Sequence, residues 1–505
     1  MNDRRSAPAS FGWFVVATIP FLALVAWHWE LGPLAAFGDW AQYMLHAKSI
    51  YAGRAYADID YLFTGLNPFI GPPAQPPGLP AALVPLLALT GGTHDPTPYK
   101  LLMVAFSLAF LGCSYIYFNR HGGRMAAVST VMLTGLWLES GFVTNVVQPD
   151  VGFCAFVWAI FCLADREGPW RSGRILAIAV LGLAALAFRV AALPLVPALA
   201  VYAWLHRRDV GWRALIPVAV WCACGLIAAL AIPGALTFGR LVALEPARLI
   251  RNVAEAARVY PFAALDLFLY PFPWNRANDA YHLVIAGFAV IGAVAWFRQD
   301  VRERVRLLTV FAVFYIGMLL VLPMQDGRYL MPLAPLAVYS AVTGVAIAFR
   351  WAANRLVGRE RSADAAAYAA FATAVAIAAL SLISLTRQPA PAVLMDVAGA
   401  RSVFELLRTE RSRAPVRAVF VNPRVLTWET GVPAMGFFLA NPDTTLAEFR
   451  AKRITHVVVG DVGTDRMRAS SIARAVEARP EAFRQIFFQG PFTVYVFDST
   501  RAPSP

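Results

Sequence analysis

The segment that decides the fold is Gly173–Leu205, which reads GRILAIAVLGLAALAFRVAALPLVPALAVYAWL. It is too long for one membrane-spanning helix, which needs about 20 apolar residues, and it is too apolar for a loop. Apart from Arg174 near its start, Arg189 is the only charged residue of this segment. We therefore expect two spans with Arg189 at the turn that joins them. A guanidinium there either reaches toward lipid headgroups or holds a phosphate.

The composition of the whole chain agrees with a membrane protein. Of 505 residues, 59% are hydrophobic and 15% are charged, and the mean hydropathy is +0.56. This balance excludes a soluble enzyme. The net charge of +13 comes from arginines between apolar runs, without the aromatic interleaving of a nucleic-acid surface, so no nucleic-acid partner is expected. All 5 cysteines lie in apolar runs and indicate neither disulfides nor a zinc site.

Apolar stretches of spanning length recur along the chain and predict a polytopic α-helical membrane protein with about eleven transmembrane helices. They cover residues 11–31, 99–118, 125–143, 149–164, 174–188, 190–205, 213–233, 280–297, 307–323, 329–349 and 365–386. A shorter apolar piece, 79–89, lies between Pro76-Pro77 and Gly91-Gly92 and is predicted to be interfacial or re-entrant.

The positive residues predict the orientation. Arginines cluster in alternate connections, whereas the opposite short connections carry almost none, so the clusters mark the cytoplasmic side. The N-terminus is then cytoplasmic and the C-terminus external. Counting 79–89 as a further span would put Arg4 and Arg5 on the wrong face.

This topology predicts two domains. A transmembrane domain covers 1–386 and carries long external loops at 32–98 and 234–279. Residues 387–505 differ in composition, with short strand-like runs alternating with helical patterns, and predict a small external α/β domain. Strands are expected at 416–421, 456–460, 485–488 and 493–497, and helices near 396–407, 446–452 and 470–478.

Two acidic residues at predicted external helix ends are candidates for chemistry. Asp39 opens a helical pattern with Tyr43 one turn along, where a carboxylate could act as a general base, although an aspartate there also serves as a helix cap. Asp150 follows Gln148-Pro149 and has the same two interpretations. Arg328 begins the tenth span and can hold a phosphate or pair with nearby Asp326. The histidines show no metal-ligand spacing.

Five short motifs follow one another along the chain. They are Gly38-Asp39-Trp40-Ala41-Gln42-Tyr43, Gly53-Arg54-Ala55-Tyr56, Pro76-Pro77-Gly78-Leu79-Pro80, Gln148-Pro149-Asp150 and Gly327-Arg328-Tyr329-Leu330-Met331-Pro332-Leu333-Ala334-Pro335. Together they resemble the motifs of C-type glycosyltransferases, in particular bacterial relatives of protein O-mannosyltransferases and of the aminoarabinose transferases that modify lipid A. The resemblance covers essentially the whole chain and is also seen in Val425–Gly431 of the C-terminal segment.

The resemblance implies a hexosyl or pentosyl transferase in a bacterial plasma membrane. It would move a sugar from a polyprenyl-phosphate carrier to a glycan, lipid or protein acceptor at the external face, with inversion. Asp39 would be the catalytic carboxylate, and Asp150 would orient the acceptor or, in some members, a divalent cation. Arg328 and Arg189 would neutralise the leaving phosphate. The predicted substrate-binding residues are Tyr43, Gln75, Gln148, Arg189, Arg328 and Tyr329.

The sequence departs from this family at two positions. Gln75 stands where aminoarabinose transferases have a lysine before Pro76-Pro77, which argues against a cationic phosphate contact there and against aminoarabinose as the sugar. Trp40 follows Asp39 where many relatives have a second acidic residue, which argues against a metal site built on that pair.

The alternatives to a glycosyltransferase are a transporter or lipid flippase, and a noncatalytic protein on the same scaffold. The long first loop and the external domain disfavour the transporter.

Overall fold

The computed structural model describes residues 11–29, 39–66, 75–92, 95–140, 143–231, 246–272, 275–322, 325–356, 362–387, 394, 397–436, 441–460 and 466–501. Its chain divides into two compact units. The helical unit contains Met1–Leu31, Lys100–Asn145 and Pro149–Pro389, and the α/β unit contains Gly32–Tyr99, Val146–Gln148 and Ala390–Pro505. Residues 234–245 of the second predicted loop lie outside the described residues. The predicted domain boundary at 386/387 stays a prediction.

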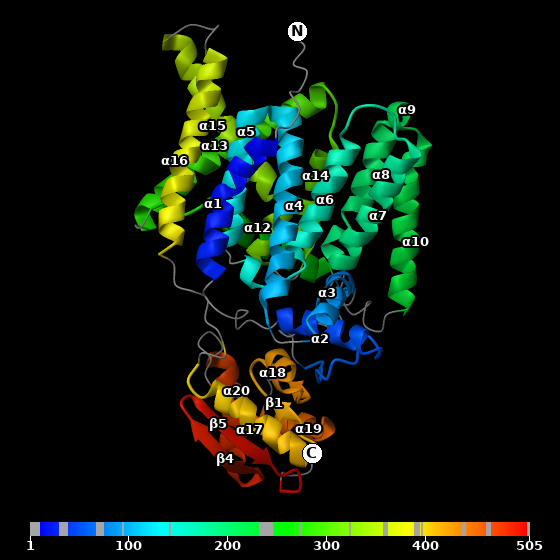
Figure 1. Ribbon diagram of the computed structural model, residues 1–505, viewed down its shortest axis with the longest axis vertical. Coiled ribbons are helices and arrows are strands. Elements are labelled where there is room, and N and C mark those ends of the chain that lie inside the picture. The colour runs from blue at the N-terminus through cyan, green and yellow to red at the C-terminus, as the bar shows by residue number, and fades with distance from the viewer. Residues whose placement is uncertain are drawn as a thin grey trace. The chain divides into compact units, whose positions relative to one another are not determined.

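Every predicted span coincides with a helix of the helical unit (Figure 1). These helices are α1 (Phe11–Trp29), α4 (Thr97–Gly122), α5 (Arg124–Ser140), α6 (Asp150–Ala164), α7 (Ser172–Phe188), α8 (Leu195–Leu205), α10 (Ile216–Ala231), α13 (Asn275–Arg302), α14 (Leu307–Val321), α15 (Ala334–Leu356) and α16 (Ser362–Leu385).

Within the described residues, 5 helical segments are long and apolar enough to cross a membrane by length and composition. They are α1, α4, α13, α16 and the segment Gly327–Arg355, in which the 3-10 helix η4 (Gly327–Leu333) leads into α15. The helices α6, α7 and α14 have 15, 17 and 15 residues, shorter than the length usual for a complete crossing. The predicted multi-pass organisation is confirmed.

The helices α13 and α15 pack at very close range because each helix places a glycine against the backbone of the other. A side-chain carbon at Gly292 would overlap the carbonyl oxygen of Ser340, and one at Gly344 would overlap that of Phe288. Small residues at helix contacts let backbones approach in this way, and the dispersion energy of the close contact drives association in lipid.

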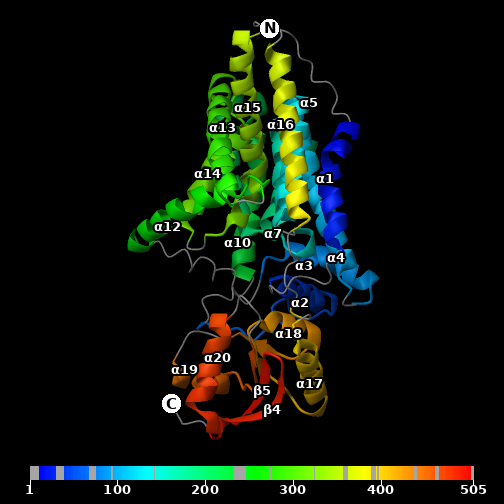
Figure 2. The same cartoon turned by 90° about the vertical axis from the view of Figure 1, so that its left-hand side faces the viewer.

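One helix of the second predicted loop has no counterpart among the spans. This helix, α12 (Pro246–Leu265), runs obliquely to the other helices of the helical unit (Figure 2). It is amphipathic, with Ile250 and Phe262 exposed and Ala256 and Tyr260 buried. Asn252 Nδ2 donates to the carbonyl oxygen of Val321, 3.0 Å away, which ties α12 to the end of α14.

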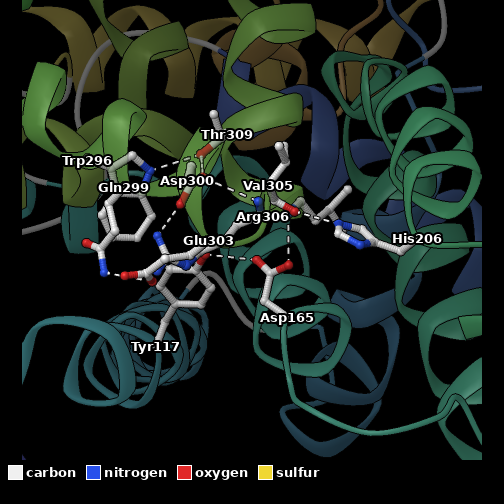
Figure 3. Close-up of polar contacts among 11 residues, drawn as sticks. Tyr117, Asp165, His206, Trp296, Gln299, Asp300, Glu303, Val305, Arg306 and Thr309 are labelled. Atoms are coloured by element: carbon white, nitrogen blue, oxygen red, sulfur yellow. Dashed lines mark hydrogen bonds and ion pairs between the residues drawn. The ribbon is translucent and has the colours of Figure 1, made fainter. Parts of the chain in front are cut away.

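The short connection between α13 and α14 is held by a buried polar cluster (Figure 3). Asp300, whose side chain is 0% exposed, accepts hydrogen bonds from the guanidinium of Arg306 and from the hydroxyl of Thr309. The Arg306 guanidinium carbon lies 4.4 Å from the ring centre of Trp296, and Trp296 Nε1 donates to Thr309 Oγ1 at 2.9 Å. Arg306 therefore stabilises the fold, although in the sequence it is one of several arginines between two apolar runs.

Asp165, just beyond the end of α6, joins the same connection to two further helices. Its Oδ1 accepts from the backbone N–H of Leu307 at 2.8 Å, and its Oδ2 accepts from the hydroxyl of Tyr117 at 2.8 Å. On the other side, His206 Nε2 donates to the carbonyl oxygen of Val305 at 2.8 Å. Figure 3 shows these groups converging on the 303–309 segment.

The α/β unit is built on a sheet of order β2-β1-β3-β5-β4. Strand β1 pairs in parallel with β2 and β3, whereas β5 pairs antiparallel with β3 and β4. The elements are α2 (Asp39–Tyr51), α3 (Gly78–Leu89), α17 (Ala400–Arg413), β1 (Ala418–Val419), α18 (Pro423–Thr430), β2 (Ala434–Met435), α19 (Pro442–Ala451), β3 (His456–Gly460), α20 (Arg466–Ala478), β4 (Phe483–Gln489) and β5 (Phe492–Phe497).

The predicted α/β character of the C-terminal segment is confirmed, as are its expected strands and helices. The strand β3 has the predicted bounds, and β1 is shorter than its apolar run, 416–421. The strand β2 was not predicted and has only two residues. The helix α18 was not predicted either, because its polar N-terminal residues hide its helical pattern. The short piece 79–89 is the helix α3, which belongs to the α/β unit and packs on α2.

Candidate functional site

The first candidate, Asp39, begins the helix α2. Its carboxylate Oδ1 accepts a hydrogen bond from Arg424 Nη1 at 2.6 Å, and Arg424 is the second residue of α18. The Asp39 side chain is 42% exposed and that of Arg424 is 7% exposed. The buried guanidinium therefore lies behind a carboxylate that is open to solvent, and this charge-assisted bond fixes one of its oxygens.

The chain leading away from α2 is anchored to the sheet beside Arg424. Tyr61 forms a parallel bridge with Ala434, and the N–H of Leu62 donates to the Ala434 carbonyl oxygen at 2.8 Å. The Arg424 guanidinium carbon lies 5.3 Å from the ring centre of Tyr61. Burial raises the pKa of Tyr61 to about 12, so its hydroxyl stays protonated next to the guanidinium.

A network on α2 fixes Gln75. His46 Nδ1 donates to the carbonyl oxygen of Tyr56 at 2.8 Å, which leaves Nε2 to accept from the backbone N–H of Gln75 at 3.3 Å. The hydroxyl of Tyr56 donates to the Gln75 carbonyl oxygen at 2.5 Å, and Gln75 Nε2 donates to Gln42 Oε1 at 3.4 Å. Tyr43, one turn from Asp39, is also buried. This part of the first loop is thus held by neutral groups.

The neutral state of His46 gives the α/β unit a pH-dependent stability. Burial lowers the pKa of His46 from 6.5 to about 4, so the unfolded chain binds this proton more readily than the folded chain. The stabilisation is complete above about pH 6.5 and is lost as the pH falls toward 4. A shift of this size corresponds to on the order of 3 kcal/mol.

We expect the substitution His46→Asn, which keeps a donor for the Tyr56 carbonyl but does not titrate, to remove this slope. The measurement is the free energy of unfolding of wild type and variant between pH 7.5 and 4. The difference between the two proteins should shrink toward low pH by about the amount above. Parallel curves over the whole range would contradict the role of His46.

In the helical unit, Asp150 begins α6 and Arg189 directly follows α7, and the two form a partly buried ion pair. The Arg189 guanidinium carbon lies 5.5 Å from the ring centre of Tyr329, and that of Arg328 lies 5.7 Å from the same ring. Arg328 Nε in turn pairs with Asp326 Oδ2 at 2.8 Å. Two guanidinium groups therefore flank one aromatic ring, and each has a carboxylate partner.

The structure brings the predicted residues into two groups. Asp39, Tyr43 and Gln75 are in the α/β unit, with Gln75 joined to α2 through the network above. In the helical unit, Asp150, Arg189, Arg328 and Tyr329 form one chain of contacts. Gln148 is partly buried and belongs to the α/β unit. Arg189 pairs with Asp150, and Arg328 with Asp326, so both arginines have protein partners.

Sequence reasoning missed Arg424 and His46. The signal for Arg424 was Asn422-Pro423-Arg424, a helix start with a cation in its first turn, where the helix dipole disfavours positive charge. An arginine in this position indicates a nearby anion. The signal for His46 was weaker, because a lone histidine on an otherwise apolar helix face is usually a core residue.

The described residues do not fit a metal centre. Among them, no three His, Cys, Asp or Glu side chains come close enough to hold an ion. Asp39 and Asp150, the two candidate carboxylates, each have an arginine partner, and a guanidinium in that place repels a divalent cation.

Comparison with solved structures identifies the fold class of this chain. The chain matches no protein-family model and no curated protein. Solved structures match nearly its whole length, and their fold is that of the C-type membrane glycosyltransferases, as the sequence motifs predict.

ArnT from Cupriavidus metallidurans in the apo state is 14% identical with a TM-score of 0.54, and the match covers 98% of this chain and 99% of ArnT. ArnT bound to undecaprenyl phosphate is 13% identical with a TM-score of 0.55, covering 98% and 100%. The archaeal oligosaccharyltransferase AglB from Archaeoglobus fulgidus, in complex with an inhibitory peptide and a dolichol-phosphate, is 12% identical with a TM-score of 0.53, covering 98% and 75%. At these identities the likeness shows the fold.

Proposed function

We propose that this protein is an inverting membrane glycosyltransferase that moves a sugar from a polyprenyl-phosphate carrier to an acceptor at the external membrane face. The observation that carries the proposal is the Asp39 carboxylate, open to solvent and fixed by a buried guanidinium, within a C-type glycosyltransferase fold. ArnT and AglB, which have this fold, were solved with undecaprenyl phosphate and dolichol-phosphate. The N-terminus is then cytoplasmic and the α/β unit external.

In the proposed reaction, Asp39 accepts the proton of an acceptor hydroxyl or amine as that group attacks the anomeric carbon from the face opposite the phosphate. The bond between the anomeric carbon and the phosphate oxygen breaks, and its electron pair leaves with the phosphate. The products are the glycosylated acceptor and the free polyprenyl phosphate, and Asp39 then returns its proton to water. One displacement of this kind inverts the anomeric configuration.

The two guanidinium groups beside Tyr329 support the fate proposed for the phosphate. Arg189 and Arg328 would donate hydrogen bonds to the phosphate oxygens while they stay paired with Asp150 and Asp326, and would stabilise the charge that develops as the bond breaks. Asp150, which is buried beside Arg189, would orient the Arg189 guanidinium. Gln75 and Gln148 would contact the sugar or the acceptor through their amides, and Tyr43 and Tyr329 would provide aromatic surface.

The test is to incubate the purified protein in vesicles made from the host's own membrane lipids and to follow the lipids by mass spectrometry. We expect free polyprenyl phosphate to accumulate with time, matched by loss of one sugar-linked polyprenyl phosphate, whose mass identifies the sugar. Protein-free vesicles and heat-denatured protein are the controls. Movement of intact lipid between leaflets without release would support a flippase. Neither release nor movement would support a noncatalytic member of the fold.

A further inference from the structure

Arg424 occupies a position that normally disfavours an arginine. It is the second residue of α18, where the partial positive charge of the helix end repels a cation, and the whole residue is 5% exposed. A guanidinium that is removed from water needs a closely paired anion to offset the loss of hydration. Arg424 at this buried helix start therefore indicates a specific role for its guanidinium that a residue better suited to a helix start could not fill.

Asp39 is the anion that meets this need. The Nη1–Oδ1 bond is 2.6 Å long, whereas the buried Nε and Nη2 atoms of Arg424 find no hydrogen-bond acceptor among the residues that the structure describes. Tyr61 lies beside the guanidinium and limits its movement. The orientation of Arg424 is thus set by this carboxylate, on a helix 385 residues away in the sequence, together with the contact to Tyr61.

The helices that carry the two charges are themselves joined. Trp40, which follows Asp39, packs edge-on against Trp428 of α18 with ring centres 6.4 Å apart. Lys48, further along α2, lies 5.7 Å from the Trp428 ring centre. The backbone of α2 is therefore held against α18 by aromatic packing, and the ion pair adds control of the Asp39 side chain itself.

We propose that Arg424 is a positioning residue through which the C-terminal segment fixes the Asp39 carboxylate for the transfer reaction. This inference rests on the proposed function. Arg424 holds one carboxylate oxygen from the buried side, so the exposed side of the group keeps a constant direction toward the incoming acceptor. The C-terminal segment is then part of the catalytic machinery in addition to any role in acceptor choice.

The test compares Arg424→Met, which keeps length but loses charge, with Arg424→Lys in the full-length protein. We expect Arg424→Met to lower kcat by about 10- to 100-fold, because small displacements of a catalytic group have effects of this size, with the donor KM within about twofold. Arg424→Lys should recover a large part of kcat. Guanidinium ion added to Arg424→Ala should restore activity in a saturable manner.

The matched control is Arg408→Met. Arg408 lies on α17 in the same unit, pairs with Glu429 and binds its carbonyl oxygen, and its side chain is 44% exposed. We expect wild-type kcat from this variant. A second check is the double variant Asp39→Asn with Arg424→Met, which should be no less active than Asp39→Asn alone, since Arg424 acts through Asp39.

The outcomes separate this inference from the proposed function. Wild-type kcat in Arg424→Met, beside an inactive Asp39→Asn, would overturn the role of Arg424 and leave the transferase intact. Loss of activity that neither lysine nor guanidinium restores, together with a lower unfolding temperature, would overturn it in favour of a purely structural ion pair. No sugar release by wild type would instead refute the transferase.

Discussion

The substitution Asp39→Asn is expected to reduce the rate of polyprenyl phosphate release by about 10²- to 10⁴-fold, the contribution usual for a positioned general base. Asparagine is nearly isosteric with aspartate and is as good a helix cap, so α2 should still begin at this residue. The substitution therefore removes the proton acceptor and the charge while keeping the local backbone. A residue that served only as a cap would tolerate it.

The rate is measured at saturating donor in lipid vesicles, and the unfolding temperature of each protein reports whether the fold is intact. Asp443→Asn is the matched control, because Asp443 also lies in the first turn of a helix and pairs with an arginine of the same unit, Arg479, at 3.3 Å. Its side chain is 72% exposed. Activity should stay within about twofold of wild type. A folded Asp39→Asn protein with wild-type kcat would disprove the catalytic assignment.

The substitution Asp300→Ala is expected to destabilise the helical unit by about 3–5 kcal/mol, the cost of leaving a buried charge without its partner. The carboxylate of Asp300 is fully buried and compensates the Arg306 guanidinium that lies over Trp296. Removing it leaves Arg306 uncompensated and Thr309 without an acceptor for its hydroxyl. Unfolding by denaturant in detergent micelles, followed by tryptophan fluorescence, measures the change.

The exposed neighbour Glu303 supplies the control for this pair. Glu303 accepts a hydrogen bond from Gln299 at 3.1 Å at the same helix end, and Glu303→Gln should change stability by no more than about 0.5 kcal/mol. The double replacement Asp300→Leu with Arg306→Leu should recover most of the loss, because apolar side chains can replace a buried ion pair without leaving a charge behind. Equal effects of Asp300→Ala and Glu303→Gln would contradict the importance of burial.

The sequence by itself determined the membrane class, the positions of the apolar helices, the α/β character of the C-terminal segment and the first candidate residues. The physical reason is that these features are local. A span needs an unbroken apolar run, a strand needs a short β-prone run, and Asp39 and Asp150 each mark a helix start within a few residues. Arg189 could be placed at a turn because one charge interrupts an apolar stretch long enough for two helices.

Only the tertiary structure decided which groups meet. The partner of Asp39 is 385 residues away, the partner of Asp150 is Arg189 at the end of the next helix, and Arg306 is buried with Asp300 although its sequence context is that of an exposed basic loop. The sequence does not show which residue a charged side chain pairs with, because pairing depends on how distant helices and strands pack. Burial determines how strongly an ion pair affects stability, and it is likewise a property of the assembled fold.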